Sequence, residues 1–241
     1  MQNDSTSAPA AQRSDVIAGV LVGGAGRRMG RPKALLPHPA GGTFVEHVVV
    51  VASPLVSEVV LLGPPATQPP QSPSPALPGV PLVPDAPGGG GPLAGLCSLL
   101  RRAGDRWALL LACDLPLLGS ETLTALLAAV RSDVDAVAYL RTATGDAGSA
   151  PAAGGRAGDA SAPPPALLPA YHACCAAYHP RVMAAAEAEL RRGAAMQALL
   201  RRVRLRALEP DAQIERQLTN VNTPEEATEL AATWRREPGG A

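Results

Sequence analysis

The sequence predicts an α/β fold in which a mostly parallel sheet lies between two layers of helices. Short apolar runs alternate with helix-like stretches along the chain, as is typical of βαβ units. The first run, Val16–Val22, is rich in β-branched residues and stops at Gly23-Gly24, which is expected of a strand buried on both faces. Because ligands bind beyond the carboxyl ends of such strands, the residues that follow each strand are the first candidates for a site.

The remaining elements follow from local patterns. Further strands are expected at four apolar runs: Glu58–Leu62, Val80–Val83, Trp107–Ala112 and Asp135–Leu140. Helices are expected at residues 43–53, 91–103 and 119–131. The second half is expected to be more helical, with helices at Pro180–Arg192 and Ala194–Arg202 and a candidate strand at Val203–Leu208. The last helix is the best marked, because Thr223, Pro224 and Glu226 form a capping box at its start; it is expected to run to about Arg236.

Composition predicts a single domain over residues 16–236 of the 241-residue chain. Three segments are too rich in Ala, Gly, Pro and Ser to build a core. Residues 1–15 are expected to be a disordered tail, and residues 64–84 and 142–166 are expected to be flexible loops. The remaining length suits one hydrophobic core.

Charge and composition exclude several classes of function. The 21 Lys and Arg residues balance 21 Asp and Glu residues, so the basic surplus of nucleic-acid and acidic-membrane binders is missing. No uncharged apolar run approaches the roughly 18 to 20 residues of a membrane span. Met1–Asp15 lacks the apolar stretch of a signal peptide, and the four cysteines show no metal or redox spacing. We therefore expect a cytoplasmic protein that binds neither nucleic acid nor membrane.

The strongest functional signal is the segment that follows the first strand: Gly23-Gly24-Ala25-Gly26-Arg27-Arg28-Met29-Gly30-Arg31-Pro32-Lys33. Its glycines allow backbone N–H groups to approach an anion, and its four cations add positive charge. A Walker A loop is excluded because Ala34 follows Lys33, and a dinucleotide fingerprint is excluded because Met29 stands where glycine is needed. The segment therefore predicts a site for a nucleoside triphosphate.

Two carboxylates follow other expected strands. Asp114 follows an apolar run, where an aspartate is costly to desolvate unless it meets a cation, so a Mg²⁺ ligand that bridges to phosphates is its natural role; a helix cap is the alternative. Asp85 opens a second glycine-rich loop that runs to Gly95. This loop suits either contact with a base or ribose or a plain linker.

Rare residue types point to the same places. Lys33 is the only lysine among the 21 basic residues, and two of the three asparagines, Asn220 and Asn222, lie two positions apart just before the last helix. The two amides suit either an Asx turn or contact with a ligand. Rarity is a pointer to these residues and does not assign them a role.

Taken in order, these segments resemble the molybdenum cofactor guanylyltransferases, which are nucleotidyltransferases of the Rossmann-like, glycosyltransferase-A-like fold. The resemblance covers about residues 16–236. It rests on four motifs: L-x-G-G-x-G-x-R-M-G-x-x-K at Leu21 to Lys33, D-x(n)-G-P-L-A-G at Asp85 to Gly95, A-C-D-x-P at Ala112 to Pro116, and N-x-N-T-P-E-E at Asn220 to Glu226. The pairs Gly23-Gly24 and Cys113-Asp114 favour guanylyl over cytidylyl transfer within the superfamily.

The resemblance implies roles for individual residues. The nucleotide would be bound by Leu21, Val22, Gly23, Gly24, Gly26, Lys33, Asp85 and Asp114, with the Leu21–Gly24 backbone recognising guanine. Lys33 would bind the triphosphate, assisted by Arg28 or Arg27, and Asp114 would hold Mg²⁺ as the cofactor. The resemblance also places the 142–166 insertion where a pterin substrate would approach.

The implied reaction is the transfer of GMP from GTP to Mo-molybdopterin, which forms the guanine dinucleotide cofactor and releases pyrophosphate. A molybdenum insertase and molybdoenzymes are candidate partners. Two alternatives stay open: a nucleotidyltransferase with another base or acceptor, such as a molybdopterin cytidylyltransferase or a sugar-phosphate nucleotidyltransferase, and a non-catalytic GTP-binding scaffold for cofactor delivery.

Overall fold

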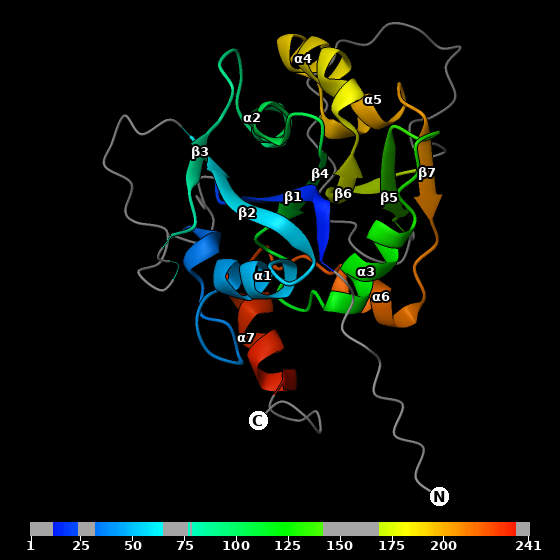
Figure 1. Ribbon diagram of the computed structural model, residues 1–241. Helices are drawn as coiled ribbons and strands as arrows, with labels where there is room; N and C mark the ends of the chain where they lie inside the picture. The colour runs from blue at the N-terminus through cyan, green and yellow to red at the C-terminus, as the bar shows by residue number, and fades with distance from the viewer. Residues whose placement is uncertain (1–11, 24–31, 65–76, 78, 142–168, 235–241) are drawn as a thin grey trace, which may run out of the picture.

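The computed structural model describes residues 12–23, 32–64, 77, 79–141 and 169–234. Within these residues, seven strands form one sheet in the order β3-β2-β1-β4-β6-β5-β7. Four neighbouring pairs are parallel, and only the two pairs that involve β6 are antiparallel. Helices cover both faces of the sheet (Figure 1). The predicted three-layer α/β/α fold with a mostly parallel sheet is therefore confirmed.

The described elements have the following bounds. The strands are β1 (Arg13–Leu21), β2 (Val56–Gly63), β3 (Leu82–Pro84), β4 (Trp107–Ala112), β5 (Ala136–Leu140), β6 (Tyr171–Tyr178) and β7 (Leu205–Leu208). The α-helices are α1 (Phe44–Ala52), α2 (Pro92–Ala103), α3 (Ser120–Ala128), α4 (Met183–Arg191), α5 (Met196–Leu200), α6 (Ala212–Gln217) and α7 (Pro224–Trp234). Two 3-10 helices are η1 (Lys33–Leu35) and η3 (Pro180–Val182).

Local signals set the ends of the two helices that follow the first strands. Helix α1 begins after Thr43 because Thr43 and Glu46 form a capping box, in which the side chain of each accepts a backbone N–H of the other. Helix α2 has Pro92 at its first position and lies between two glycines, Gly91 with φ 81° and Gly104 with φ 61°. A side chain at either glycine would strain the backbone.

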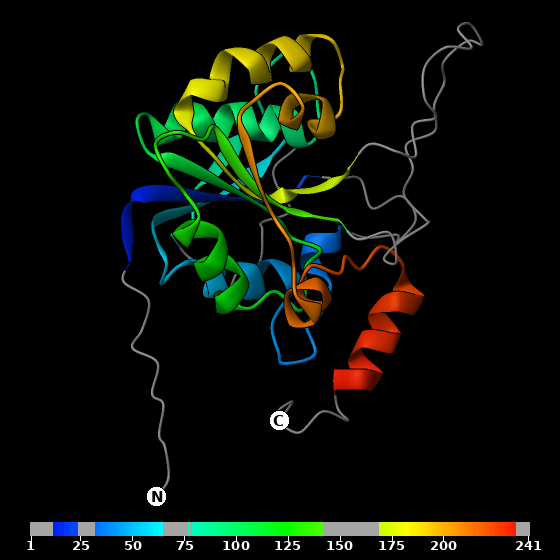
Figure 2. The same ribbon diagram turned by 90° about the vertical axis from the view of Figure 1, so that its right-hand side faces the viewer.

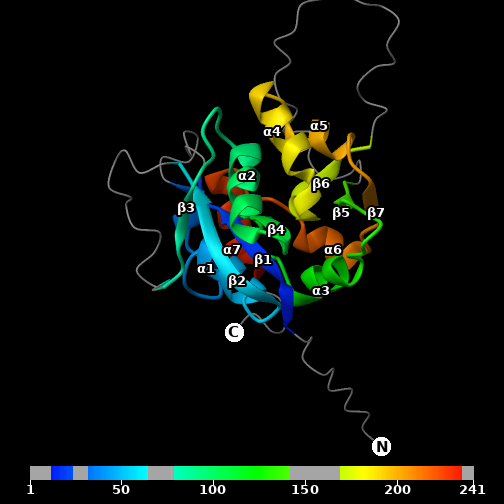
Figure 3. The same cartoon turned by 45° about the horizontal axis from the view of Figure 1, so that its top comes forward.

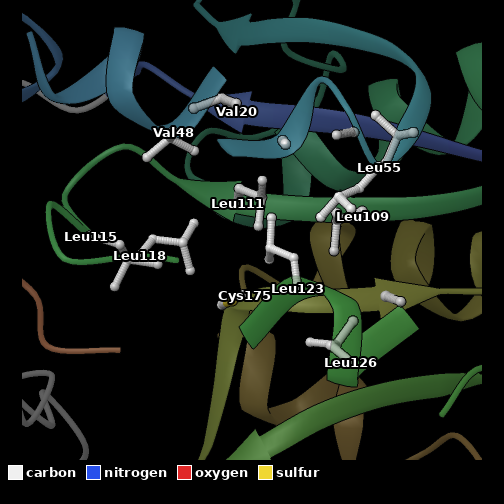
Figure 4. Close-up of a cluster of buried hydrophobic side chains, with 14 of the residues drawn as sticks. Val20, Val48, Leu55, Leu109, Leu111, Leu115, Leu118, Leu123, Leu126 and Cys175 are labelled. Carbon is white, nitrogen blue, oxygen red and sulfur yellow. The ribbon is translucent and has the colours of Figure 1, made fainter. Parts of the chain in front are cut away.

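The core lies on both faces of the central strands. Alternate residues of β4 contribute to opposite layers, so Leu109 and Leu111 pack with α1 and α3 (Figure 4), whereas Ala108 and Leu110 pack with α2 and α4. Figure 2 shows the sheet between these two helical layers, and Figure 3 shows α2, α4 and α5 together over one face. Burial on both faces explains the continuous apolar run that predicts β4.

Strand β6 is the main element that sequence patterns miss. It inserts antiparallel between β4 and β5, with Leu111 paired to Cys175 and Ala136 paired to Tyr178. Its central residues, Ala-Cys-Cys-Ala-Ala, are not β-branched, so β-propensity gives little signal. The small side chains fit beneath helices on both faces, since Ala176 and Ala177 are fully buried in opposite layers.

Several predicted boundaries also need correction. Strand β1 begins at Arg13, inside the expected tail, because Arg13 pairs with Val56 of β2. Strand β3 covers Leu82–Pro84 rather than Val80–Val83, the helix expected at Pro180–Arg192 is divided into η3 and α4, and α6 was not expected. Residues 1–11, most of 64–84 and all of 142–166 lie outside the described residues. No helix in the described part of the chain is long and apolar enough to cross a membrane.

Two histidines attach the loop after β4 to the segment around α1. The rings of His38 and His47 stack, with centroids 4.2 Å apart. Their Nε2 atoms lie 2.8 Å from the carbonyl oxygen of Pro116 and 2.9 Å from that of Leu118, so each Nε2–H donates to the loop. Burial lowers the pKa of both imidazoles below 6.5, which keeps the stacked pair neutral at pH 7.

We expect Leu109→Ala to lower the free energy of unfolding by about 2 to 5 kcal/mol, because the side chain is fully buried in β4 and its loss leaves a cavity. Urea unfolding followed by circular dichroism measures the change. Val50→Ala is the matched control, since Val50 of α1 is 67% exposed, and it should change stability by less than about 0.5 kcal/mol. Equal losses in the two variants would contradict this description of the core.

Stability is expected to decrease as pH falls below 6.5, because buried imidazoles resist protonation. Burial lowers the pKa of His38 and His47, and burial with the nearby Arg141 charge lowers the pKa of His172 to about 4. Between 6.5 and these lowered values the unfolded chain binds protons that the folded chain does not, so acid destabilises the fold.

The melting temperature between pH 7 and pH 5 measures this effect. His38→Gln and His47→Gln should each give a shallower dependence on pH than the wild type, even where the variant is less stable at pH 7. A slope that is unchanged in both variants and in His172→Gln would show that other groups cause the acid sensitivity.

Candidate functional site

Asp114 lies just after the carboxyl end of β4, at the centre of a polar network. Its Oδ2 accepts a hydrogen bond from Lys33 Nζ at 2.9 Å, and its Oδ1 accepts one from Asn220 Nδ2 at 2.7 Å. Its backbone carbonyl accepts the N–H of Val221 at 3.0 Å. The Asp114 side chain is 15% exposed, so its charge is largely removed from water and is compensated by these partners.

Lys33 begins η1, at the end of the glycine-rich segment, and joins two parts of the network. Besides Asp114, its Nζ donates to Asn222 Oδ1 at 2.6 Å. An ammonium group has three N–H donors, so these two bonds leave one donor for another acceptor. The Lys33 side chain is 26% exposed, and a ligand at this edge of the sheet can therefore reach it.

Asn220 and Asn222 are placed by the start of α7. The Thr223 hydroxyl accepts the N–H of Glu226 at 3.2 Å, as the predicted capping box requires, whereas the Glu226 carboxylate accepts the N–H of Asn222 at 2.5 Å. Glu226 therefore fixes the backbone next to the amide that contacts Lys33. Below this turn, Val221 packs with Leu36 and Phe44 in a small apolar cluster.

The structure thus brings Lys33 and Asp114 together, although 81 positions separate them in the sequence. The N-x-N-T-P-E-E motif contains both asparagines, but the sequence alone does not place them among the binding residues. In the structure each amide binds a predicted catalytic side chain: Asn222 accepts from Lys33, and Asn220 donates to Asp114. The scarcity of asparagine elsewhere in the chain was the signal that pointed to them.

A second group of predicted residues lies at the carboxyl ends of β1 and β3. Asp85 follows β3, and its N–H donates to the carbonyl of Gly63 at 2.7 Å. Burial raises the pKa of the Asp85 carboxyl above 3.8. A Cβ on Gly95 in the first turn of α2 would lie 2.6 Å from Leu21 Cδ2 and 3.6 Å from Asp85 Oδ1. Glycine in the G-P-L-A-G motif therefore lets α2 approach β1 closely beside Asp85.

Val22 and Gly23 continue from β1 along the same edge. Val22 donates its N–H to the carbonyl of Leu62 at 2.8 Å, and a Cβ on Gly23 would lie 3.1 Å from the ring of Pro64. These residues lie between Asp85 and Asp114 because β1 is separated from β3 by β2 and pairs with β4 on its other side. The predicted residues Gly24, Gly26, Arg27, Arg28 and Arg31 lie outside the described residues.

The donor set around Asp114 fits Mg²⁺. One carboxylate and two amide groups offer oxygen atoms, the ligands that Mg²⁺ prefers. In the described part of the chain no group of three or more His, Cys, Asp or Glu side chains could form an all-protein metal cage. A single carboxylate suits an ion that is held mainly by substrate phosphates and water. The neighbouring Cys113 is an unsuitable ligand, because burial raises the pKa of its thiol to about 12.

Known proteins resemble parts of this chain. A protein from Bacillus cereus, named probable molybdenum cofactor guanylyltransferase, is 34% identical over 120 residues, which cover 49% of this chain and 58% of that protein. A protein of the same name from Rhodopirellula baltica is 51% identical over 47 residues, 20% of this chain and 22% of that protein. The matched segment therefore spans less than two thirds of either relative.

Solved structures share the fold. Molybdopterin-guanine dinucleotide biosynthesis protein A from Archaeoglobus fulgidus has a TM-score of 0.68 at 20% identity and matches 92% of this chain and all of that chain. The 2-C-methyl-D-erythritol 4-phosphate cytidylyltransferase from Thermus thermophilus has a TM-score of 0.60 at 20% identity, over 90% of this chain and 98% of that chain. The model of the MobA-like NTP transferase domain matches residues 18–212, and with the network around Asp114 in place, we conclude that the chain belongs to this family.

Proposed function

We propose that the protein transfers GMP from GTP to Mo-molybdopterin, forming molybdopterin guanine dinucleotide and releasing pyrophosphate. The observation that carries this proposal is the contact of Lys33 with Asp114 at the carboxyl end of β4, in a chain of the MobA-like NTP transferase family. The names of the Bacillus cereus and Rhodopirellula baltica relatives support the choice of acceptor and base.

The proposed reaction requires no proton transfer by the protein. The attacking phosphate of the acceptor is already anionic, so the reaction needs no general base. Catalysis then consists of aligning two phosphates that repel each other and compensating their charge. The ammonium group of Lys33 supplies positive charge, and its third N–H is available for an oxygen of the triphosphate.

Asp114 and the two asparagines would hold the metal that assists this transfer. When bound, Mg²⁺ supplies charge neutralisation across the phosphates. Asn220 fixes the Asp114 carboxylate through Oδ1, and Lys33 contacts Oδ2, so the orientation of the carboxylate is set before substrate arrives. Lys33 would then exchange its contact with Asp114 for one with the triphosphate, which its flexible side chain allows.

The part of the site that binds guanine would lie at the ends of β1, β2 and β3, on the side of β1 that faces away from β4. The backbone of Leu21–Gly24 would recognise the base, and Asp85 would contact the nucleotide from the end of β3. Arg28 and Arg27 would add positive charge beside Lys33. We place the reaction in the cytoplasm, where GTP is available, with a molybdenum insertase and molybdoenzymes as proposed partners.

Lys33→Ala and Asp114→Ala are each expected to lower kcat/KM by about 100-fold or more, since each removes a group that compensates charge in the transition state. Release of pyrophosphate from GTP in the presence of molybdopterin measures turnover. Asp105→Ala is the matched control, because Asp105 is an exposed aspartate two residues before β4 rather than two residues after it. Near-normal activity in either site variant would overturn the assigned roles.

Nucleotide selectivity can be measured without the acceptor. With Mg²⁺ present, GTP should raise the melting temperature more than CTP, ATP or UTP at equal concentration. At a GTP concentration of about 100 times Kd the stabilisation should be about 2.7 kcal/mol. EDTA should remove most of the shift, and the Asp114→Ala variant should respond to GTP as the wild type does in EDTA. A larger shift with CTP would favour a cytidylyltransferase, and a GTP shift without any pyrophosphate release would favour a scaffold.

A further inference from the structure

A cavity of about 420 Å³ lies on the far side of the Asp114 network from Asp85. Its walls come from the loop after β4, the adjoining ends of β5 and β6, and helices α6 and α7. The lining residues that matter most are Pro116, Arg141, His172, Asn220, Glu229 and Thr233. Asn220 belongs both to this wall and to the network, so the cavity opens directly beside Asp114.

The directions of β4, β5 and β6 explain why Asp114, His172 and Arg141 lie near the same edge of the sheet. Strand β6 runs antiparallel to β4 and β5, so its first residues lie at the edge where β4 and β5 end. The pairing of β4 with β6 reaches Leu111 and Cys175, so His172, near the start of β6, lies at the same edge of the sheet as Asp114, just after β4. On the other side, the N–H of Arg141 donates to the carbonyl of Ala170 at 2.8 Å. Asp114 just after β4, His172 near the start of β6 and Arg141 just after β5 thus lie at the same edge of three adjacent strands.

Arg141 makes this end of the cavity positively charged. Among the described residues that line the cavity, Arg141 is the only lysine or arginine. Its guanidinium forms no ion pair with the part of the chain that the structure describes. His172 is neutral at pH 7, since its pKa is lowered to about 4, and so adds no second charge. A guanidinium that no described carboxylate compensates suits a phosphate, which it can contact through two parallel N–H bonds.

The wall formed by α6 and α7 is acidic, because Glu215, Glu226 and Glu229 line it. Glu226 is occupied by the N–H of Asn222, but Glu229 is exposed where it lines the cavity. A carboxylate repels phosphate and accepts N–H donors. The cavity therefore suits a ligand with an anionic phosphate at one end and a ring with N–H groups at the other, and a pterin phosphate has both.

We propose that this cavity binds the acceptor, with Arg141 holding its phosphate and Glu229 accepting N–H bonds from its ring. The assignment rests on the proposed function. In the reaction, an oxygen of the acceptor phosphate forms a bond to the α-phosphorus of GTP. The bond from that phosphorus to the oxygen that bridges to the β-phosphate breaks, and pyrophosphate leaves with the electron pair. Arg141 holds the acceptor phosphate beside Asp114, while Lys33 binds the triphosphate.

Binding of molybdopterin, followed anaerobically by the fluorescence of its pterin, tests the proposal without turnover. Arg141→Gln should weaken binding by about tenfold or more, since it removes a charge-assisted contact to phosphate, and Arg141→Lys should weaken it less because the charge remains. Both variants should keep the wild-type thermal shift with GTP and Mg²⁺, which shows that they are folded. Arg131→Gln, an exposed arginine before β5, is the matched control and should bind as the wild type does.

Turnover and binding separate the two levels of the proposal. If the wild type binds molybdopterin and Arg141→Gln does not, the cavity assignment holds even where no pyrophosphate is released, and only the proposed transfer fails. If Arg141→Gln binds molybdopterin as tightly as the wild type, or if the wild type does not bind it, the cavity assignment is overturned. Glu229→Gln should also weaken binding, and unchanged affinity would remove Glu229 from the ring end.

Discussion

The need to compensate one partly desolvated carboxylate organises the whole site. Asp114 follows a strand whose residues are buried on both faces, and its charge requires nearby donors. Those donors come from Lys33, at the end of the first glycine-rich segment, and from Asn220, just before the last helix. Satisfying a single aspartate therefore fixes the relative positions of three segments that are far apart in the sequence.

The order of the strands divides the edge of the sheet into two halves. Asp85 and Leu21 lie on the side of β3 and β1, whereas His172 and Arg141 lie on the side of β6 and β5. Asp114 lies between them. Under the proposed function, each half would bind one of the two phosphate substrates, and the central carboxylate would be adjacent to both. The reversal of β6 is what brings His172 to this edge.

Much of this could be predicted from the sequence where the determinants are local. Continuous apolar runs predicted β1 and β4, and the capping box at Thr223 predicted α7. Strand β6 could not be predicted, because its small residues are selected by packing between two helical layers rather than by β-propensity. Lys33 and Asp114 could be named as site residues from their motifs, but their ion pair depends on tertiary structure. The amides that hold them, and the place of Arg141 beside the cavity, also arise only when distant strands pair.

Helix α7 is only weakly packed against the rest of the domain, and this affects how the site can open. None of its residues is fully buried, and it is held by its capping turn, by the partly buried Ala227 and Leu230 that pack on the small apolar cluster, and by the ring of Trp234 against His38. Segments with few buried apolar contacts open at a lower free energy than the whole domain. The element that carries Glu229 and anchors Asn222 can therefore detach locally while the sheet stays folded, and under the proposed function this local opening gives a bulky product a way out.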